Sequence, residues 1–309
     1  MFIAFGVSLM LINPQSAKAA GLLPALAALV VVGIFDDICD LQPLTKLFVQ
    51  SVAAAVLIVP GWQVIDLVAN IGGRQLQLGI VSLPLSLLLI VGLINAVNMI
   101  DGVDGLAGGV VAVTLFWLAI VANVLGDQAD VVKILLLFFA VLGFLLFNLP
   151  RPGRGASVFM GDAGSMMLGA SIAYFTLVLT ARSGLRTETS GNLSLVTVMW
   201  LLALPMIDTV SLIVQRLLAG VSPLVADRRH LHHLLLGAGI PPAQVTGLLT
   251  AVAALLGAIG FTGFALKIPD HVMALGLLVP IAAHTAFVCC RQGRGVGPVR
   301  SASDAAMSR

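Results

Sequence analysis

The sequence predicts an all-α, polytopic integral membrane protein, and three observations lead to that class. Of its 309 residues, 59% are hydrophobic and only 10% are charged, whereas soluble domains contain about a quarter charged residues. The mean hydropathy is +1.09. The apolar runs are long and continuous rather than alternating, which favours membrane-spanning helices over a β-barrel.

Ten apolar segments are predicted to be helices, because about 20 apolar residues cross a bilayer and fewer suffice inside a bundle. They are, in order, 2–12, 21–35, 44–59, 83–97, 104–124, 131–148, 164–181, 193–217, 243–265 and 272–290. The first resembles the core of a signal peptide but lacks the preceding basic residues, so it is interpreted as a short helix. Residues 61–82 alternate in hydropathy around Gly72 and Gly73, which favours a small outer hairpin.

Lysine and arginine residues are distributed unequally over the two sides that these helices define. Ten of them lie on or beside one side and six on the other. The positive-inside rule therefore predicts that the richer side is cytoplasmic. Residues 1–290 are predicted to form one membrane domain and 291–309 a short basic cytoplasmic tail. The cytoplasmic loops are 36–43, 98–103, 149–163 and 218–242.

Four polar or glycine-rich stretches fall on the predicted cytoplasmic side. They read "FDDICD", "NAVNMIDGVDGLAGG", "FMGDAGS" and "DRRHLHH", and they are far apart in the sequence. Loop residues without a common role would be scattered over both sides. Their convergence predicts a single cytoplasmic active site.

The first stretch places Asp36, Asp37 and Asp40 within five positions. If the helix continues, Asp40 lies on the same face as Asp36, beside a helix C-terminus that disfavours anions. A solvated helix end would also accommodate such residues. A Mg²⁺ or phosphate site explains them better, because a hard divalent cation binds carboxylate oxygens and offsets their repulsion. On the next helix, Lys46 and Gln50 are candidates for contacting a phosphate.

In the second stretch, Asn95, Asn98, Asp101 and Asp104 follow one another every three residues. The glycines between them allow the backbone to approach a ligand and helices to pack closely. A glycine-rich helix start with Asp104 as N-cap would explain the glycines. It would not explain two amides and two acids, so a ligand site is preferred.

The third stretch places Asp162 where a helix is predicted to begin. An N-capping role is one interpretation. A metal–phosphate site is the other, because free N–H groups at a helix N-terminus bind anions.

The fourth stretch combines arginines with histidines: Arg228, Arg229, His230, His232 and His233. Histidines suggest zinc, but neighbouring arginines would oppose a metal and fit a diphosphate better. A basic loop touching anionic lipid is the alternative.

Other polar residues of the apolar segments receive weaker interpretations. Asp208, Ser211 and Gln215 share one helical stripe, and an acid inside a membrane usually faces the bundle interior. Pro205 allows a bend just before them. His271 and His284 stand alone in the sequence and are interpreted as structural.

Together, the four stretches resemble the polyprenyl-phosphate N-acetylhexosamine-1-phosphate transferases, from about Gly33 to Gly239. "SVFMGDAGS" and "SPLVADRRHLHHLLL" are similar to the branch that transfers N-acetylglucosamine 1-phosphate. The resemblance implies transfer of a sugar 1-phosphate from a UDP-sugar to undecaprenyl (polyprenyl) phosphate, with release of UMP. It also implies dependence on Mg²⁺, with Mn²⁺ as a substitute, and a place in the bacterial cytoplasmic (inner) membrane.

The resemblance also implies roles for individual residues. Asp36 and Asp37 match the family's paired aspartates, linked to the acceptor phosphate and the metal. The expected catalytic residues are Asp36, Asp37, Asp101 and Asp104, and the expected metal ligands are Asp162 and Asp101. The expected substrate-binding residues are Asn95, Asn98, Lys46, Arg228, Arg229, His230, His232 and His233. The net charge of +2 suggests that the protein has no nucleic-acid partner. A homodimer is one option for its oligomeric state.

Members of this family have an additional N-terminal helix and a basic cytoplasmic loop before the helix that matches 2–12. The lysine or arginine of that loop has no counterpart in this sequence. Either the start codon is misplaced, or the chain is a fragment, or the enzyme is impaired, and the 309-residue form is expected to be inactive or strongly impaired. Two other functions are weighed against transfer. An intramembrane, Mg²⁺-dependent prenyltransferase would not need "GDAGS" or "HLHH", and an ion-coupled transporter would place its ionisable residues deeper in the membrane.

Overall fold

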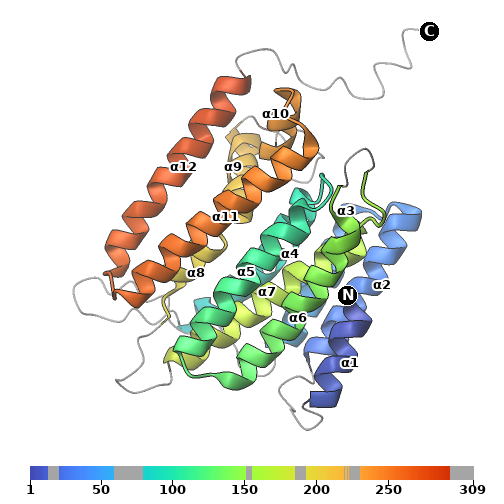
Figure 1. Cartoon of the computed structure of the whole chain (residues 1–309), viewed down its shortest axis with the longest axis vertical. Helices are drawn as coiled ribbons and strands as arrows, with labels where there is room; N and C mark the ends of the chain where they lie inside the picture. Colours follow the sequence, from blue (N-terminus) through green and yellow to red (C-terminus); the bar gives the residue numbers. More distant parts are fainter. Residues whose placement is uncertain are drawn as a thin grey trace.

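A computed structural model describes residues 1–12, 21–58, 79–150, 155–184, 193–218, 220, 222 and 230–292. Within these ranges the chain is helical and contains no β-strand. The helices pack side by side as a bundle (Figure 1). They are α1 (Phe2–Ile12), α2 (Leu22–Cys39), α3 (Pro43–Ile58), α4 (Ser82–Ile100), α5 (Leu106–Val124), α6 (Gln128–Asn148), α7 (Gly161–Gly184), α8 (Leu195–Leu201), α9 (Ala203–Leu218), α10 (Leu231–Gly237), α11 (Pro242–Ala265) and α12 (Asp270–Gln292).

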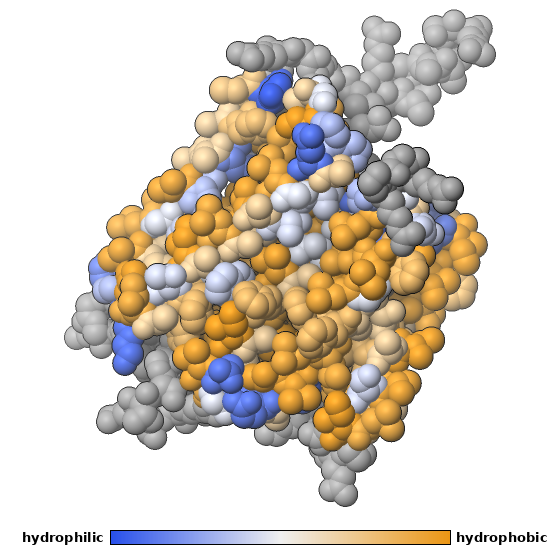
Figure 2. Space-filling view, viewed as in Figure 1, coloured by the Kyte–Doolittle hydropathy of each residue, from blue (hydrophilic) through white to orange (hydrophobic). Residues whose placement is uncertain are grey.

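The predicted class, an all-α polytopic membrane protein, is confirmed. Seven of the described helices are long and apolar enough to cross a membrane, or eight if the bent pair α8–α9 counts as one span. The predicted number of ten is not confirmed, because α1 and α3 are shorter apolar helices. Hydrophobic residues cover most of the face in Figure 2, and the most hydrophilic ones lie toward its two ends, as expected for a protein surrounded by lipid.

The predicted segment 193–217, in which Pro205 was expected to allow a bend, is broken into two helices in the structure. The chain bends by 91° between α8 and α9. Pro205 has no N–H to donate to the carbonyl of Leu201, so the helix loses a hydrogen bond at the break. The Thr114 hydroxyl of α5 lies 3.5 Å from that carbonyl oxygen and compensates in part.

The predicted outer hairpin, residues 61–82, is only partly covered by the structure. Residues 59–78 lie outside the described ranges. The last four residues of the prediction are helical rather than extended, because Gly79–Val81 form a 3₁₀-helix and Ser82 begins α4.

Helix α7 is the most deeply buried of the candidate spans, with 89% of its apolar window inside the protein. Two close approaches of glycine to backbone fix its position. A side chain at Gly33 of α2 would collide with the backbone of Ala163, and one at Gly169 would lie 2.6 Å from the Cα atom of Ile94 in α4. Helix α7 is thereby held against α2 and α4, and its first turn lies where both of those helices end.

Candidate active site

The acidic stretches meet in one group of side chains, called here the carboxylate cluster: Asp36, Asp37, Lys46, Asn98, Asp101, Asp104 and Asp162. Asp36, at the end of α2, is only 8% exposed. Its Oδ1 accepts a hydrogen bond from the Leu41 backbone N–H at 2.8 Å, and its Oδ2 lies 2.7 Å from the Lys46 ammonium group. Lys46 Nζ also lies 3.4 Å from Asp162 Oδ2. Lys46 therefore bridges carboxylates that come from two helices.

Asp37 and Asp162 connect the ends of α2, α4 and α7. Asp37 Oδ1 accepts a hydrogen bond from the Asp162 backbone N–H at 2.9 Å, in the first turn of α7. Gly161 has a φ of +65°, and a Cβ atom there would lie 2.5 Å from Asp37 Oδ2. The Asn98 side-chain amide donates to Asp162 Oδ1 at 2.9 Å and lies 2.9 Å from Ser165 Oγ. These contacts fix the Asp162 carboxylate at the centre of the cluster.

Asp101 and Asp104 lie in the turn between α4 and α5. Burial and then the negative charges of Asp162, Asp37 and Asp104 raise the pKa of Asp101 to about 7. Asp104 Oδ2 accepts a hydrogen bond from the Ala156 backbone N–H at 3.0 Å, which ties this turn to the segment preceding α7. Burial contributes most to this rise in pKa, and the remainder comes from a local excess of negative charge that a bound cation would offset.

The carboxylate cluster can contribute only part of the coordination shell of a divalent cation. No group of three or more His, Cys, Asp or Glu side chains in the described ranges is arranged to hold a metal ion. Mg²⁺ is usually bound by one or two carboxylates, with water and substrate phosphates completing the shell. Asp101 and Asp162 supply two such carboxylates in a cluster rich in negative charge, so the residues present fit Mg²⁺ that is bound together with a phosphate-bearing substrate.

Asp40 was expected to share a face with Asp36 only if the helix continued, and this condition is not met. Helix α2 ends at Cys39, and Asp40 caps it in the left-handed conformation with a φ of 50°. Its backbone N–H bonds the Asp36 carbonyl oxygen at 2.9 Å, and its side chain is exposed. Because the helix does not continue, the i+4 relation does not apply, and Asp40 lies outside the carboxylate cluster.

Asn95 and Gln50 bond each other instead of pointing into that cluster. The Asn95 amide donates to Gln50 Oε1 at 2.7 Å and to the Val91 carbonyl at 2.8 Å. Gln50 is almost completely buried between α3, α4 and α7. The pair joins α3 to α4 one turn below Asn98.

A second group, called here the histidine cluster, is formed by Asp208, His230, His232, His233 and His284. Asp208 of α9 is 2% exposed. Its Oδ2 lies 2.9 Å from His230 Nδ1, and its Oδ1 lies 3.0 Å from His284 Nε2 on α12. The sequence suggested that His284 stands alone. In the structure it contacts Asp208 instead. Arg228 and Arg229 lie outside the described residues.

His232 connects the two clusters. Its side chain is almost fully buried, and burial followed by the nearby histidines lowers its pKa to about 4. Its ring centroid lies 4.1 Å from that of His233. A Cβ atom on Gly102 would collide with His232 Nε2, so the imidazole rests against the residue that follows Asp101. Within the described part of the chain, this buried Nε2 atom has no hydrogen-bond partner.

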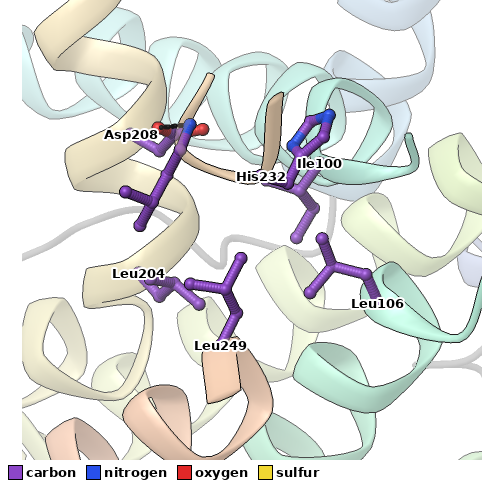
Figure 3. Close-up of a pocket in the computed structure, with 7 residues that line it drawn as sticks. Ile100, Leu106, Leu204, Asp208, His232 and Leu249 are labelled. Atoms are coloured by element: carbon purple, nitrogen blue, oxygen red, sulfur yellow. Dashed lines mark hydrogen bonds between the residues drawn. The ribbon is translucent and has the colours of Figure 1, made fainter. Parts of the chain in front are cut away.

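Figure 3 shows His232 beside Ile100, above a small apolar pocket that also contacts Asp208. The pocket has a volume of about 10 Å³, which is about the minimum for one water molecule. It is lined by the leucines Leu106, Leu204, Leu231 and Leu249. These side chains support the histidine cluster from below.

A much larger apolar cavity, of about 730 Å³, lies between α5, α6 and α11. Gly105 and Leu149 form part of its wall, and Trp117 and Phe138 line it farther along the helices. Since Gly105 follows Asp104 directly, the cavity begins beside the carboxylate cluster.

Sequence reasoning missed the link between Asp208 and His284. The two residues are 76 positions apart, and neither has a neighbouring residue whose spacing indicates the other. The available signal was an acid on an apolar helix, which needs a polar partner inside the bundle. Any of the otherwise isolated histidines was a candidate for that partner.

Comparisons with known proteins agree with the resemblance of the four stretches. The profile of glycosyl transferase family 4 matches residues 19–180. The undecaprenyl-phosphate alpha-N-acetylglucosaminyl 1-phosphate transferase of Yersinia pestis is 33% identical over 256 residues, which are 81% of this chain and 68% of that enzyme. The enzyme of that name from Haemophilus influenzae is 34% identical over 253 residues, 81% of this chain and 70% of its own length.

The corresponding enzyme of Escherichia coli K12 is 32% identical over 253 residues, with 81% of this chain and 67% of the enzyme covered. The predicted family is therefore confirmed, and this chain belongs to glycosyl transferase family 4.

Proposed function

We propose that this protein transfers N-acetylglucosamine 1-phosphate from UDP-N-acetylglucosamine to undecaprenyl phosphate and releases UMP. The reaction would take place at the cytoplasmic face of the bacterial inner membrane. The observation that carries the proposal is the meeting of acids from α2, α7 and the turn after α4 around Lys46 and Asn98. Next to them lies the Nε2 atom of His232, which has no hydrogen-bond partner among the described residues. The names of the relatives supply the substrates.

In the proposed reaction, an oxygen of the acceptor phosphate attacks the β-phosphorus of the UDP-sugar. A new P–O bond forms, the bond between the β-phosphorus and the bridging oxygen breaks, and UMP leaves with the electron pair. Asp37 is the better candidate for contacting the acceptor phosphate, because its side chain is exposed. Asp36 is buried with both oxygens engaged, so its role is to position Lys46.

Mg²⁺ is proposed to bind Asp101 and Asp162. When bound, it would offset the negative charge of the phosphates that approach each other. Asn98 orients Asp162 through one of its carboxylate oxygens. The apolar cavity beside Gly105 has the character expected of a binding site for the acceptor's hydrocarbon chain.

The proposal is tested with membranes that contain the protein, UDP-N-acetylglucosamine with a radiolabelled sugar, and undecaprenyl phosphate. We expect labelled lipid only when the acceptor and Mg²⁺ are both present. If the protein were a prenyltransferase, label would be incorporated from a prenyl diphosphate and not from the sugar nucleotide. The absence of labelled lipid under all conditions would contradict the proposal.

The native cysteines provide a test of topology. Cys39 ends α2, and Cys289 and Cys290 lie in the last turn of α12, and all three are exposed. Both helix ends lie at the same end of the bundle (Figure 1). A membrane-impermeant maleimide is expected to label these cysteines in inverted vesicles and not in intact cells.

The matched control is Gln128→Cys in a cysteine-free background. Gln128 begins α6 at the opposite end of the bundle and is exposed. It should react from outside intact cells. Labelling of Cys39 from outside would overturn the cytoplasmic site.

His232→Ala and His233→Ala are expected to lower kcat/KM for UDP-N-acetylglucosamine about 10- to 100-fold, because each removes a hydrogen-bonding group beside the leaving UMP. The amount of folded protein in the membrane should change less than the activity. Initial rates at several UDP-sugar concentrations measure the effect. If kcat/KM were unchanged in both variants, this loop would instead be a lipid-contacting segment.

A further inference from the structure

The Asp208 carboxylate accepts three hydrogen bonds, two from the start of α10 and one from α12. His230 Nδ1 lies 2.9 Å from Oδ2, while the Leu231 N–H and His284 Nε2 both lie 3.0 Å from Oδ1. Leu231 is the first residue of α10, and His284 belongs to α12. One buried carboxylate thus fixes a histidine ring, the start of a helix and the last helix of the bundle.

These contacts determine which nitrogen of each imidazole carries hydrogen. An ionised carboxylate only accepts hydrogen bonds, so both facing nitrogens must be donors. Neutral His230 is then the Nδ1–H tautomer, with a lone pair on Nε2. His284 is the Nε2–H tautomer, because its buried Nδ1 has no partner among the described residues.

The same carboxylate aligns the helix that carries the other histidines. The bond from the Leu231 N–H to Asp208 holds the first turn of α10, and His232 follows in that turn. The rings of His230 and His232 are nearly parallel, at 7°, with centroids 5.7 Å apart. A change in the orientation of His230 would therefore disturb the His232 ring that rests on Gly102.

We infer that Asp208 and His284 are positioning residues of the proposed transfer reaction. They hold His230 with the lone pair of Nε2 available to accept a hydrogen bond or a proton from the substrate. They also hold His232 against Gly102. His284 supplies the third donor that this buried carboxylate needs, since an unsatisfied buried anion is strongly unfavourable. The role of the last helix is thus to complete a hydrogen-bond network that ends in the histidine motif. The kinetic part of this inference rests on the proposed function, whereas the tautomers do not.

The tautomers are measured by NMR on the whole protein in lipid nanodiscs, with ¹⁵N-labelled imidazole rings. The chain has 5 histidines, and the His230 signals are assigned by their loss in His230→Gln. We expect the Nδ1–H tautomer at His230 in the native protein and a shift toward Nε2–H in Asp208→Asn. A native His230 in the Nε2–H form would overturn the inference, whatever the enzyme's activity.

Kinetics then separate positioning from a purely structural role. His284→Ala should lower kcat about 10- to 100-fold with little change in KM for the UDP-sugar, the range typical of groups that orient metal-bound histidines. His284→Gln should recover most of the activity, because its side-chain amide can donate to Asp208. The matched control is His271→Ala, which alters an exposed histidine of the same helix and should leave kcat unchanged.

If His284→Ala accumulates poorly, Asp208→Asn serves as the second variant, with the same expected fall in kcat. A native kcat in both His284→Ala and Asp208→Asn would overturn the inference, as would equal losses in His284→Ala and His284→Gln. If the native protein transferred no sugar phosphate but showed the expected tautomers, the proposed function would fail while the network stood.

Discussion

Asp162→Asn is expected to lower sugar-phosphate transfer about 100- to 1000-fold, because it removes an anionic ligand where charge must be stabilised. Asparagine has nearly the same shape, and its oxygen can still accept the bond that Asn98 donates at 2.9 Å. Helix α7 should therefore keep its place. The measurement is transfer by membranes with equal amounts of each protein, at saturating Mg²⁺.

Asp40→Asn is the matched control, because Asp40 is a nearby aspartate with an exposed side chain outside the carboxylate cluster. It should keep the native rate. In the presence of UDP-N-acetylglucosamine, Mg²⁺ should also raise the melting temperature of the native protein and of Asp40→Asn, and not that of Asp162→Asn. A near-native rate for Asp162→Asn would show that the metal assignment is wrong.

Lys46→Met is expected to abolish most of the activity and to destabilise the protein. Lys46 lies 2.7 Å from Asp36, which is 8% exposed, and 3.4 Å from Asp162. Without the ammonium group, Asp36 loses its cation and faces a second carboxylate. Leaving a buried group without its partner costs about 1–3 kcal/mol. Thermal unfolding in detergent and transfer assays measure the two effects.

The double variant Asp36→Asn with Lys46→Met distinguishes the two roles of Lys46. If Lys46 mainly neutralises Asp36, the double variant should recover the melting temperature that Lys46→Met loses. If Lys46 also binds a substrate phosphate, as the sequence suggested, activity should stay low and KM should rise. An unchanged melting temperature in Lys46→Met would contradict the ion-pair role.

The sequence predicted the elements that depend on local patterns. The helices predicted from long apolar runs lie close to α1–α7 and α11–α12. A chain embedded in lipid must form its backbone hydrogen bonds internally, which favours helices. The acids of the first three stretches were expected to share one end of the bundle, and the structure brings Asp36, Asp101 and Asp162 into one cluster there. The resemblance to a transferase family depended on those same stretches.

Features that depend on tertiary contacts were not predictable. A bend at Pro205 was expected, but its size and its position at Leu202 were not, because a proline near a helix start can be tolerated or can end the preceding helix. The Thr114 hydroxyl that compensates comes from another helix. The position of Asp40 depended on where α2 ended, which the carboxylates alone did not indicate. The contact between Asp208 and His284 joins two distant helices.

The most direct test of the proposed function follows the β-phosphate of the donor. The purified protein in nanodiscs is given undecaprenyl phosphate, Mg²⁺ and UDP-N-acetylglucosamine that carries radioactive phosphorus in the β-position, and lipid is separated from water. We predict that the label enters the lipid fraction while UMP appears in the water in equal amount. Two results would contradict transfer of a sugar 1-phosphate. One is sugar in the lipid while the label stays in the water as UDP, and the other is no label in the lipid at all.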